Sequence, residues 1–142
     1  MTAMRKFWRL SSAEQRLLLN ATALLVLYRV ALWVLPWRRL AASRPSAGTS
    51  RAARFSVERL EWAIRTAQRR IPRATCLSQA LALQHLLARE GYASSIHIGV
   101  AKEVGAKFEA HAWVEHDGVT LLSSASELAH YSHLMALQTQ SR

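Results

Sequence analysis

The sequence predicts an α+β fold in which three helices precede a small antiparallel sheet and one more helix follows it. Apolar residues recur at helical spacing in residues 56–71 and 76–90, and residues 10–40 contain a long, nearly uncharged apolar run. Residues 94–101 and 108–115 instead alternate between apolar and other side chains, which is typical of half-buried strands. The dipeptide Asp117-Gly118 lies just beyond the second of these segments and is a strong signal for a two-residue hairpin turn. The expected sheet therefore has three antiparallel strands.

The first expected helix, over residues 10–40, is apolar on nearly all sides. Ser11 or Ser12 can cap its N-terminus, and Glu14 places an acid in its first turn. The longest uncharged run, residues 17–28, is short for a membrane span, and including Arg29 extends it to about 21 residues. A helix of this kind must bury its surface. We expect residues 12–40 to pack on the domain or on a partner protein, with contact to a membrane surface or a membrane span as alternatives.

The predicted domain organisation has three parts. Residues 1–45 form the apolar helix with basic flanks, residues 46–55 a linker, and residues 56–142 a catalytic domain. Within that domain, Ser56 caps a helix that Pro72 ends, and Gly91 ends the helix that begins at Cys76. A C-terminal helix capped by Ser124 or Ser126 is expected from the spacing of Leu128, Tyr131, Leu134, Met135 and Leu137.

Cysteine content and charge exclude several classes of protein. A single cysteine cannot form an internal disulfide, which favours a reducing cytoplasm. The six histidines do not fall in a recognised metal-ligand spacing, so neither a metal nor another cofactor is expected. Residues 1–73 carry 15 Lys and Arg against three Glu, a net charge of +12. Because no nucleic-acid-binding motif accompanies these charges, an acidic peptide or an anionic lipid is a better candidate partner than nucleic acid.

Cys76 and His111 are the candidate catalytic pair. Cys76 lies at the expected start of a helix, and His111 lies in the middle of an expected strand. The partial positive charge of a helix N-terminus and a nearby imidazolium both favour the thiolate form of a cysteine. The histidine could then protonate a leaving amine and activate water against the thioester. Main-chain N–H groups at the helix start, including that of Cys76, would stabilise the oxyanion.

Four sequence blocks in a fixed order resemble one enzyme family. They are Arg73-Ala74-Thr75-Cys76-Leu77-Ser78-Gln79-Ala80-Leu81-Ala82-Leu83, then residues 86–91, then Ile96-His97-Ile98-Gly99-Val100, then Phe108-Glu109-Ala110-His111-Ala112-Trp113-Val114-Glu115 with Asp117-Gly118. Over residues 55–125 the chain resembles the leader peptidase of lasso-peptide biosynthesis. The resemblance implies a reduced transglutaminase-like, papain-type cysteine protease fold, with the nucleophile helix packed on a small antiparallel sheet. It also implies that Cys76 is the nucleophile and His111 the general base and acid.

The resemblance further implies a substrate and partners. The enzyme would remove the leader from a ribosomally made precursor peptide in the cytoplasm. It would act with a separate leader-binding recognition protein and pass the core peptide to an ATP-using macrolactam synthetase. Two other functions stay open: a catalytically decayed peptide-binding scaffold of the same fold, and a transglutaminase-like acyl transferase.

The third catalytic residue departs from the family pattern. The family has an aspartate shortly after the hairpin, whereas the only aspartate here, Asp117, occupies the turn itself. Continuing the hairpin register places Ser124 opposite His111. We therefore predict that Ser124 orients the imidazole, with Ser123 and Glu127 as alternatives. A serine hydroxyl can accept the imidazole N–H but brings no charge to stabilise the imidazolium.

Overall fold

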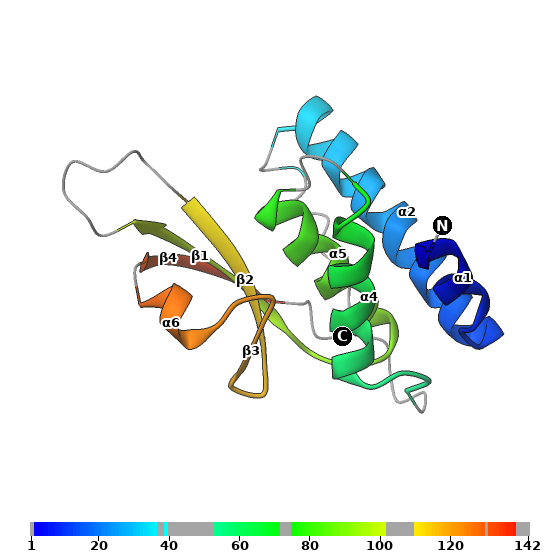
Figure 1. Cartoon of the computed structure of the whole chain (residues 1–142). Coiled ribbons are helices and arrows are strands. Elements are labelled where there is room, and N and C mark those ends of the chain that lie inside the picture. The colour runs from blue at the N-terminus through cyan, green and yellow to red at the C-terminus, as the bar shows by residue number, and fades with distance from the viewer. Residues whose placement is uncertain are drawn as a thin grey trace.

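The computed structural model describes residues 2–36, 39, 53–71, 75–101, 110–129 and 131–138. In chain order its elements are α1 (Thr2–Trp8), α2 (Ser12–Val34), α4 (Val57–Gln68), α5 (Cys76–Arg89), β1 (Ser95–Ala101), β2 (Ala110–His116), β3 (Val119–Leu121), α6 (Ala125–Leu128) and β4 (Tyr131–Gln138). Figure 1 shows α2, α4 and α5 grouped together, with the sheet to one side of them. The predicted α+β class is confirmed. The expected connection between β1 and β2, at residues 102–107, lies outside the described residues.

Short sequence signals set the helix ends, and those at Ser11, Ser56 and Gly91 were predicted. Ser11 caps α2 in a capping box with Glu14, and Ser56 caps α4. Thr75 caps α5, and its side chain accepts a main-chain N–H from the first turn of that helix. Gly91 follows α5 with φ +88°, a conformation that favours glycine and ends helices. These caps fix where α5 begins, and so they fix where Cys76 lies.

Helix α2 packs into the same hydrophobic core as α4 and α5. Leu17, Leu18, Ala21 and Leu25 are buried and belong to one cluster with leucines of α4 and α5. The opposite side of α2 is exposed, and Trp33 is 91% exposed. Among the described residues, α2 is the one helix whose length and composition would allow it to cross a membrane. Most of the expected linker at residues 46–55 lies outside the described residues. Helix α2 itself packs directly on α4 and α5.

The four strands form an antiparallel sheet in the order β3-β2-β1-β4. Ile96 pairs with Val114, and both are buried in the cluster that contains the leucines of α5. His97 pairs with Trp113, one residue along each strand. Because side chains alternate across a strand, His97, His111 and Trp113 share the face of the sheet that is turned away from α5.

The C-terminal segment differs from the prediction. The expected C-terminal helix is wrong beyond Leu128, because α6 has four residues and Tyr131–Gln138 forms β4 along the second edge of β1. A register shift between Ile98 and Gly99 lets the two strands pair over their length. Pairing satisfies the main-chain N–H and C=O groups of an edge that would otherwise stay open. This long-range gain outweighs the helical spacing of the apolar residues in the segment. His133, which falls within the predicted C-terminal helix, therefore lies in the sheet.

Candidate active site

Helix α5 presents Cys76 as its first residue. Thr75 Oγ1 accepts the N–H of Ser78 at 3.2 Å, which fixes the first turn. The Cys76 thiol is partly exposed, and its Sγ lies 4.0 Å from the carbonyl oxygen of Ala110, the residue before His111 in β2. The first N–H groups of a helix have no partner within it, so donors suited to an oxyanion lie beside this thiol.

A serine and two aromatic rings hold the imidazole of His111. Its Nε2 lies 2.5 Å from Ser123 Oγ, and Ser123 is buried. The ring stacks with Tyr131 at a centroid distance of 5.2 Å and with Trp113 at 6.2 Å. Within the described part of the chain, neither the Cys76 thiol nor another side chain is hydrogen-bonded to Nδ1. The ring is thus oriented from Nε2, and the structure brings Cys76 to the backbone next to His111 rather than to its ring.

The serine hydrogen-bonded to His111 is Ser123, and the predicted position of Ser124 is wrong. The pairing of β2 with β3 follows the predicted register only to the end of β3. Leu122 then has φ +67°, which turns the chain out of the strand. Ser124 instead begins α6, where its N–H donates to Glu127 Oε2 at 2.9 Å and its Oγ accepts the Glu127 N–H at 3.3 Å. Of the three candidates, Ser123 takes the place beside the imidazole.

Glu61 of α4 fixes the turn that carries Ser123. Its Oε1 accepts the N–H of Leu122 at 2.9 Å and pairs with Arg65 at 2.8 Å. A left-handed conformation costs an L-residue about 1–2 kcal/mol, and this hydrogen bond helps to hold Leu122 in it. The sequence gives no sign of the role, because an acid and a base four residues apart are typical of an exposed helix face.

Burial and one carboxylate set the charge state of the imidazole. Burial lowers the pKa of His111 below its ordinary value, and the negative charge of Glu127 acts in the opposite direction. A lowered pKa keeps the ring neutral near pH 7, which is the form that accepts a proton. The pKa of Glu127 is lowered chiefly by the Ser124 N–H, with smaller effects from His111 and Arg65.

A second pair of histidines extends the same face of the sheet. His97 Nδ1 lies 2.9 Å from His133 Nε2, and His97 Nε2 lies 2.8 Å from Ser95 Oγ and 3.2 Å from the Glu115 carboxylate. His97 also stacks on Trp113 at 5.7 Å. Among the described residues, no group of three or more ligand-type side chains is placed to hold a metal ion. Neither His133 nor Tyr131 was expected here, because both positions were assigned to a helix. The alternation of Tyr131 and His133 along the chain is the signal that could have found them.

A hollow of about 350 Å³ reaches Thr75, the residue before Cys76. Its described lining consists of Thr75 and four residues of α2: Arg29, Val30, Leu32 and Trp33. Helix α2 therefore supplies a largely apolar wall beside the start of α5.

The comparison with family models agrees with this fold. The model of the transglutaminase-like superfamily matches residues 21–136, a range that contains Cys76, His111 and Ser123. The chain belongs to the transglutaminase-like superfamily. This superfamily includes cysteine peptidases and acyltransferases. A search of curated proteins and a search of solved structures gave no match.

The range matched by the superfamily model begins at residue 21 and includes more than half of α2. This agrees with the packing of α2 on α4 and α5. Cysteine peptidases and acyltransferases both pass through a thioester on the cysteine. They differ in whether water or an amine then attacks that thioester. Within this superfamily, the reaction therefore depends on which acceptor reaches the thioester.

Proposed function

We propose that this chain is a cysteine peptidase that removes the leader from a ribosomally made lasso-peptide precursor before macrolactam formation. The observation that carries the proposal is the position of Cys76 at the N-terminus of α5, against the strand that bears His111. Both residues lie in the sequence blocks that resemble the lasso leader peptidase, inside the range matched by the superfamily.

The proposed reaction has two steps. The Cys76 thiolate attacks the carbonyl carbon of the scissile peptide bond, and main-chain N–H groups at the start of α5 stabilise the oxyanion. The His111 imidazolium gives its proton to the amide nitrogen, the C–N bond breaks, and the core peptide leaves as an amine. His111 then takes a proton from water, the resulting hydroxide attacks the thioester, and the C–S bond breaks. The products are a leader carboxylate and the free thiol.

The proposal requires a movement that brings the thiol and the imidazole together, because Cys76 begins α5 whereas His111 lies on the face of the sheet turned away from that helix. Cys76 Sγ, now 4.0 Å from the Ala110 carbonyl, must come within reach of His111 Nδ1, while Ser123 holds Nε2. Catalytic hydrogen bonds are often long in enzymes without substrate and shorten when the substrate binds. A peptide carbonyl inserted at the start of α5 would displace the thiol from Ala110.

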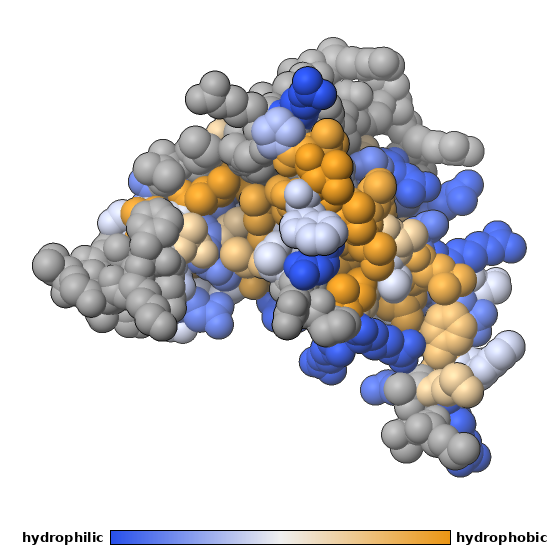
Figure 2. Space-filling view, turned by 90° about the horizontal axis from the view of Figure 1, so that it is seen from above, coloured by the Kyte–Doolittle hydropathy of each residue, from blue (hydrophilic) through white to orange (hydrophobic). Residues whose placement is uncertain are grey.

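The expected partners are the precursor peptide, a separate leader-binding recognition protein and the macrolactam synthetase, all in the cytoplasm. Two features support a docking role for α2: its outward side exposes apolar residues, including Leu27 at 59% and Trp33 at 91%, and Arg29 lies among them. The face seen from above in Figure 2 carries a broad hydrophobic area bordered by hydrophilic residues. We assign this side of α2 to the recognition protein rather than to a membrane, because the other side of the helix is packed on the domain.

Cleavage of a synthetic precursor in the presence of its recognition protein tests the function. We expect the wild-type chain to cut one bond, and we expect Cys76→Ala and His111→Ala to lose this activity. His116→Ala is the matched control, because His116 lies at the other end of β2 and bonds to the Ala93 carbonyl at 2.6 Å.

Mass spectrometry separates the alternatives. After hydrolysis, the masses of the two fragments add up to the mass of the precursor plus one water. After acyl transfer, the leader fragment instead carries the mass of the attached amine. An amine adduct as the main product would show that the chain is an acyl transferase and not a peptidase. No cleavage by a folded wild-type chain with its recognition protein would favour the peptide-binding scaffold.

A further inference from the structure

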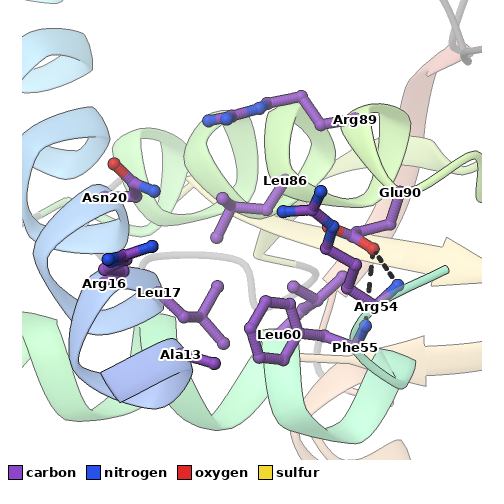
Figure 3. Close-up of a pocket in the computed structure, with 10 residues that line it drawn as sticks. All are labelled: Ala13, Arg16, Leu17, Asn20, Arg54, Phe55, Leu60, Leu86, Arg89 and Glu90. Carbon is purple, nitrogen blue, oxygen red and sulfur yellow. Dashed lines mark hydrogen bonds between the residues drawn. The ribbon is translucent and has the colours of Figure 1, made fainter.

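A second cavity lies where α2, α4 and α5 meet, at the end of α5 far from the thiol. It has a volume of about 240 Å³, and its apolar floor includes the buried side chains of Leu17, Leu60 and Leu86. Phe55 adds an aromatic side chain to the lining. A cavity of this size holds one or two amino-acid side chains. Figure 3 shows the three leucines and Phe55 between the polar residues of the rim.

The rim of this cavity is strongly basic. Arg16 comes from α2, Arg54 from the segment before α4, and Arg89 from the last turn of α5. The one acid in the described lining is Glu90, whose Oε2 accepts the main-chain N–H groups of Arg54 at 2.6 Å and Phe55 at 3.4 Å. The carboxylate is therefore engaged by the backbone. In the described part of the chain, no ion pair neutralises the guanidinium groups of Arg16, Arg54 or Arg89.

This combination selects a ligand chemistry. Three guanidinium groups around an apolar floor favour a ligand with a carboxylate next to an apolar group. The cavity lies between three helices, which suits a pair of side chains from a peptide better than the head groups of a flat lipid surface. The geometry points to an exosite that binds an apolar residue and a neighbouring acidic residue of the peptide substrate.

The position of the exosite sets the minimum number of residues between the acidic anchor and the scissile bond of the peptide. Helix α5 is 14 residues long, so its two ends lie about 20 Å apart at a rise of about 1.5 Å per residue. Cys76 begins this helix and Arg89 ends it. An extended chain needs at least about six residues to cover that distance. The acidic anchor is therefore at least six residues from the scissile bond. This assignment to a substrate rests on the proposed peptidase function.

Binding can be measured without cleavage. The probe is the capped hexapeptide Gly-Ser-Leu-Glu-Ser-Gly, with Gly-Ser-Leu-Gln-Ser-Gly as its neutral counterpart. Each is titrated into the full chain carrying Cys76→Ala, and leucine methyl NMR signals report contact with Leu17, Leu60 and Leu86. We expect these signals to shift, and we expect the glutamate peptide to bind at least fivefold more tightly than the glutamine peptide.

Two double variants distinguish binding at the cavity rim from nonspecific attraction to the positive charge of the protein. Arg16→Gln with Arg89→Gln removes two guanidinium groups of the rim, and we expect it to abolish the preference for glutamate. Arg69→Gln with Arg70→Gln removes two exposed charges outside the described lining, and we expect it to retain the preference. Equal preference in both double variants, or no preference in the parent, would overturn the exosite. Binding of phosphatidylglycerol vesicles that is lost only in the rim variant would identify the ligand as lipid and overturn the peptide assignment.

Cleavage assays test the exosite and the peptidase function separately. We expect the rim variant to raise KM for the precursor about tenfold while kcat stays the same. Cleavage that is independent of Arg16 and Arg89 would retain the peptidase and reject the exosite. Peptide binding at the rim by a chain that never cleaves would retain the exosite and reject the peptidase.

Discussion

Replacing Ser123 by alanine removes the hydroxyl that is hydrogen-bonded to the imidazole of His111 in the described part of the chain. The Nε2–Oγ distance is 2.5 Å, and after the substitution only the stacked rings of Tyr131 and Trp113 hold the imidazole. A hydrogen bond between neutral groups contributes about 0.5–1.5 kcal/mol, which corresponds to roughly 2- to 12-fold in kcat/KM. We expect a loss of this size at pH 7.5, measured by initial rates of precursor cleavage, with little change in KM.

Two companion variants make this prediction specific. Ser124→Ala removes the cap of α6 but leaves the contact with Nε2, so its kcat/KM stays near that of the wild type. Ser123→Asp places a carboxylate beside the imidazole and stabilises the imidazolium, so the acid limb of the kcat/KM profile moves to higher pH. Full activity of Ser123→Ala together with a loss in Ser124→Ala would refute the assignment of Ser123.

Three further outcomes follow from other contacts. Because burial lowers the pKa of His111 below 6.5, kcat/KM stays full at neutral pH and falls only below pH 6.5, and an acid limb above that value would contradict the assignment. Glu61→Ala frees the turn beside the imidazole and lowers kcat, whereas Glu58→Ala on the same helix leaves kcat unchanged in the same assay. In urea unfolding, Leu25→Ala lowers the free energy of unfolding by about 2–5 kcal/mol and the exposed Leu27→Ala by less than about 0.5 kcal/mol. Equal effects of the two leucine variants would show that α2 is not part of the core.

The features that follow from short-range rules could be predicted from the sequence. Helix caps at Ser11 and Ser56 depend on residues three positions apart, and the turn at Asp117-Gly118 depends on two adjacent residues with positive φ. The same rules place Cys76 at the start of a helix and His111 in a strand. Because these interactions are local, the sequence carries enough information to place both candidate catalytic residues.

The features that depend on distant contacts could not be predicted. The register of β2 and β3 ends at Leu122, whose left-handed conformation is held by Glu61 from a helix 61 residues earlier in the chain. Counting along the hairpin therefore placed Ser124, rather than Ser123, opposite the imidazole. The prediction for residues 131–138 was wrong for a similar reason, because pairing with β1 decides the structure of this segment and the paired residues are 30 to 43 positions apart in the chain.

In the proposed site, Ser123 and Glu127 together would fill the roles that a single aspartate has in a Ser-His-Asp triad. Such an aspartate both orients the imidazole and stabilises its positive charge. Here Ser123 contacts Nε2, while the charge of Glu127 raises the pKa of His111 against the effect of burial. A buried carboxylate is costly unless it is paired, whereas Glu127 is exposed and held at the start of α6 by Ser124. Screening by water weakens its effect on the ring, so the imidazolium receives less stabilisation than from a buried aspartate. We infer that this arrangement suits a thiol better than a hydroxyl nucleophile, since a cysteine needs less help from its base to become nucleophilic.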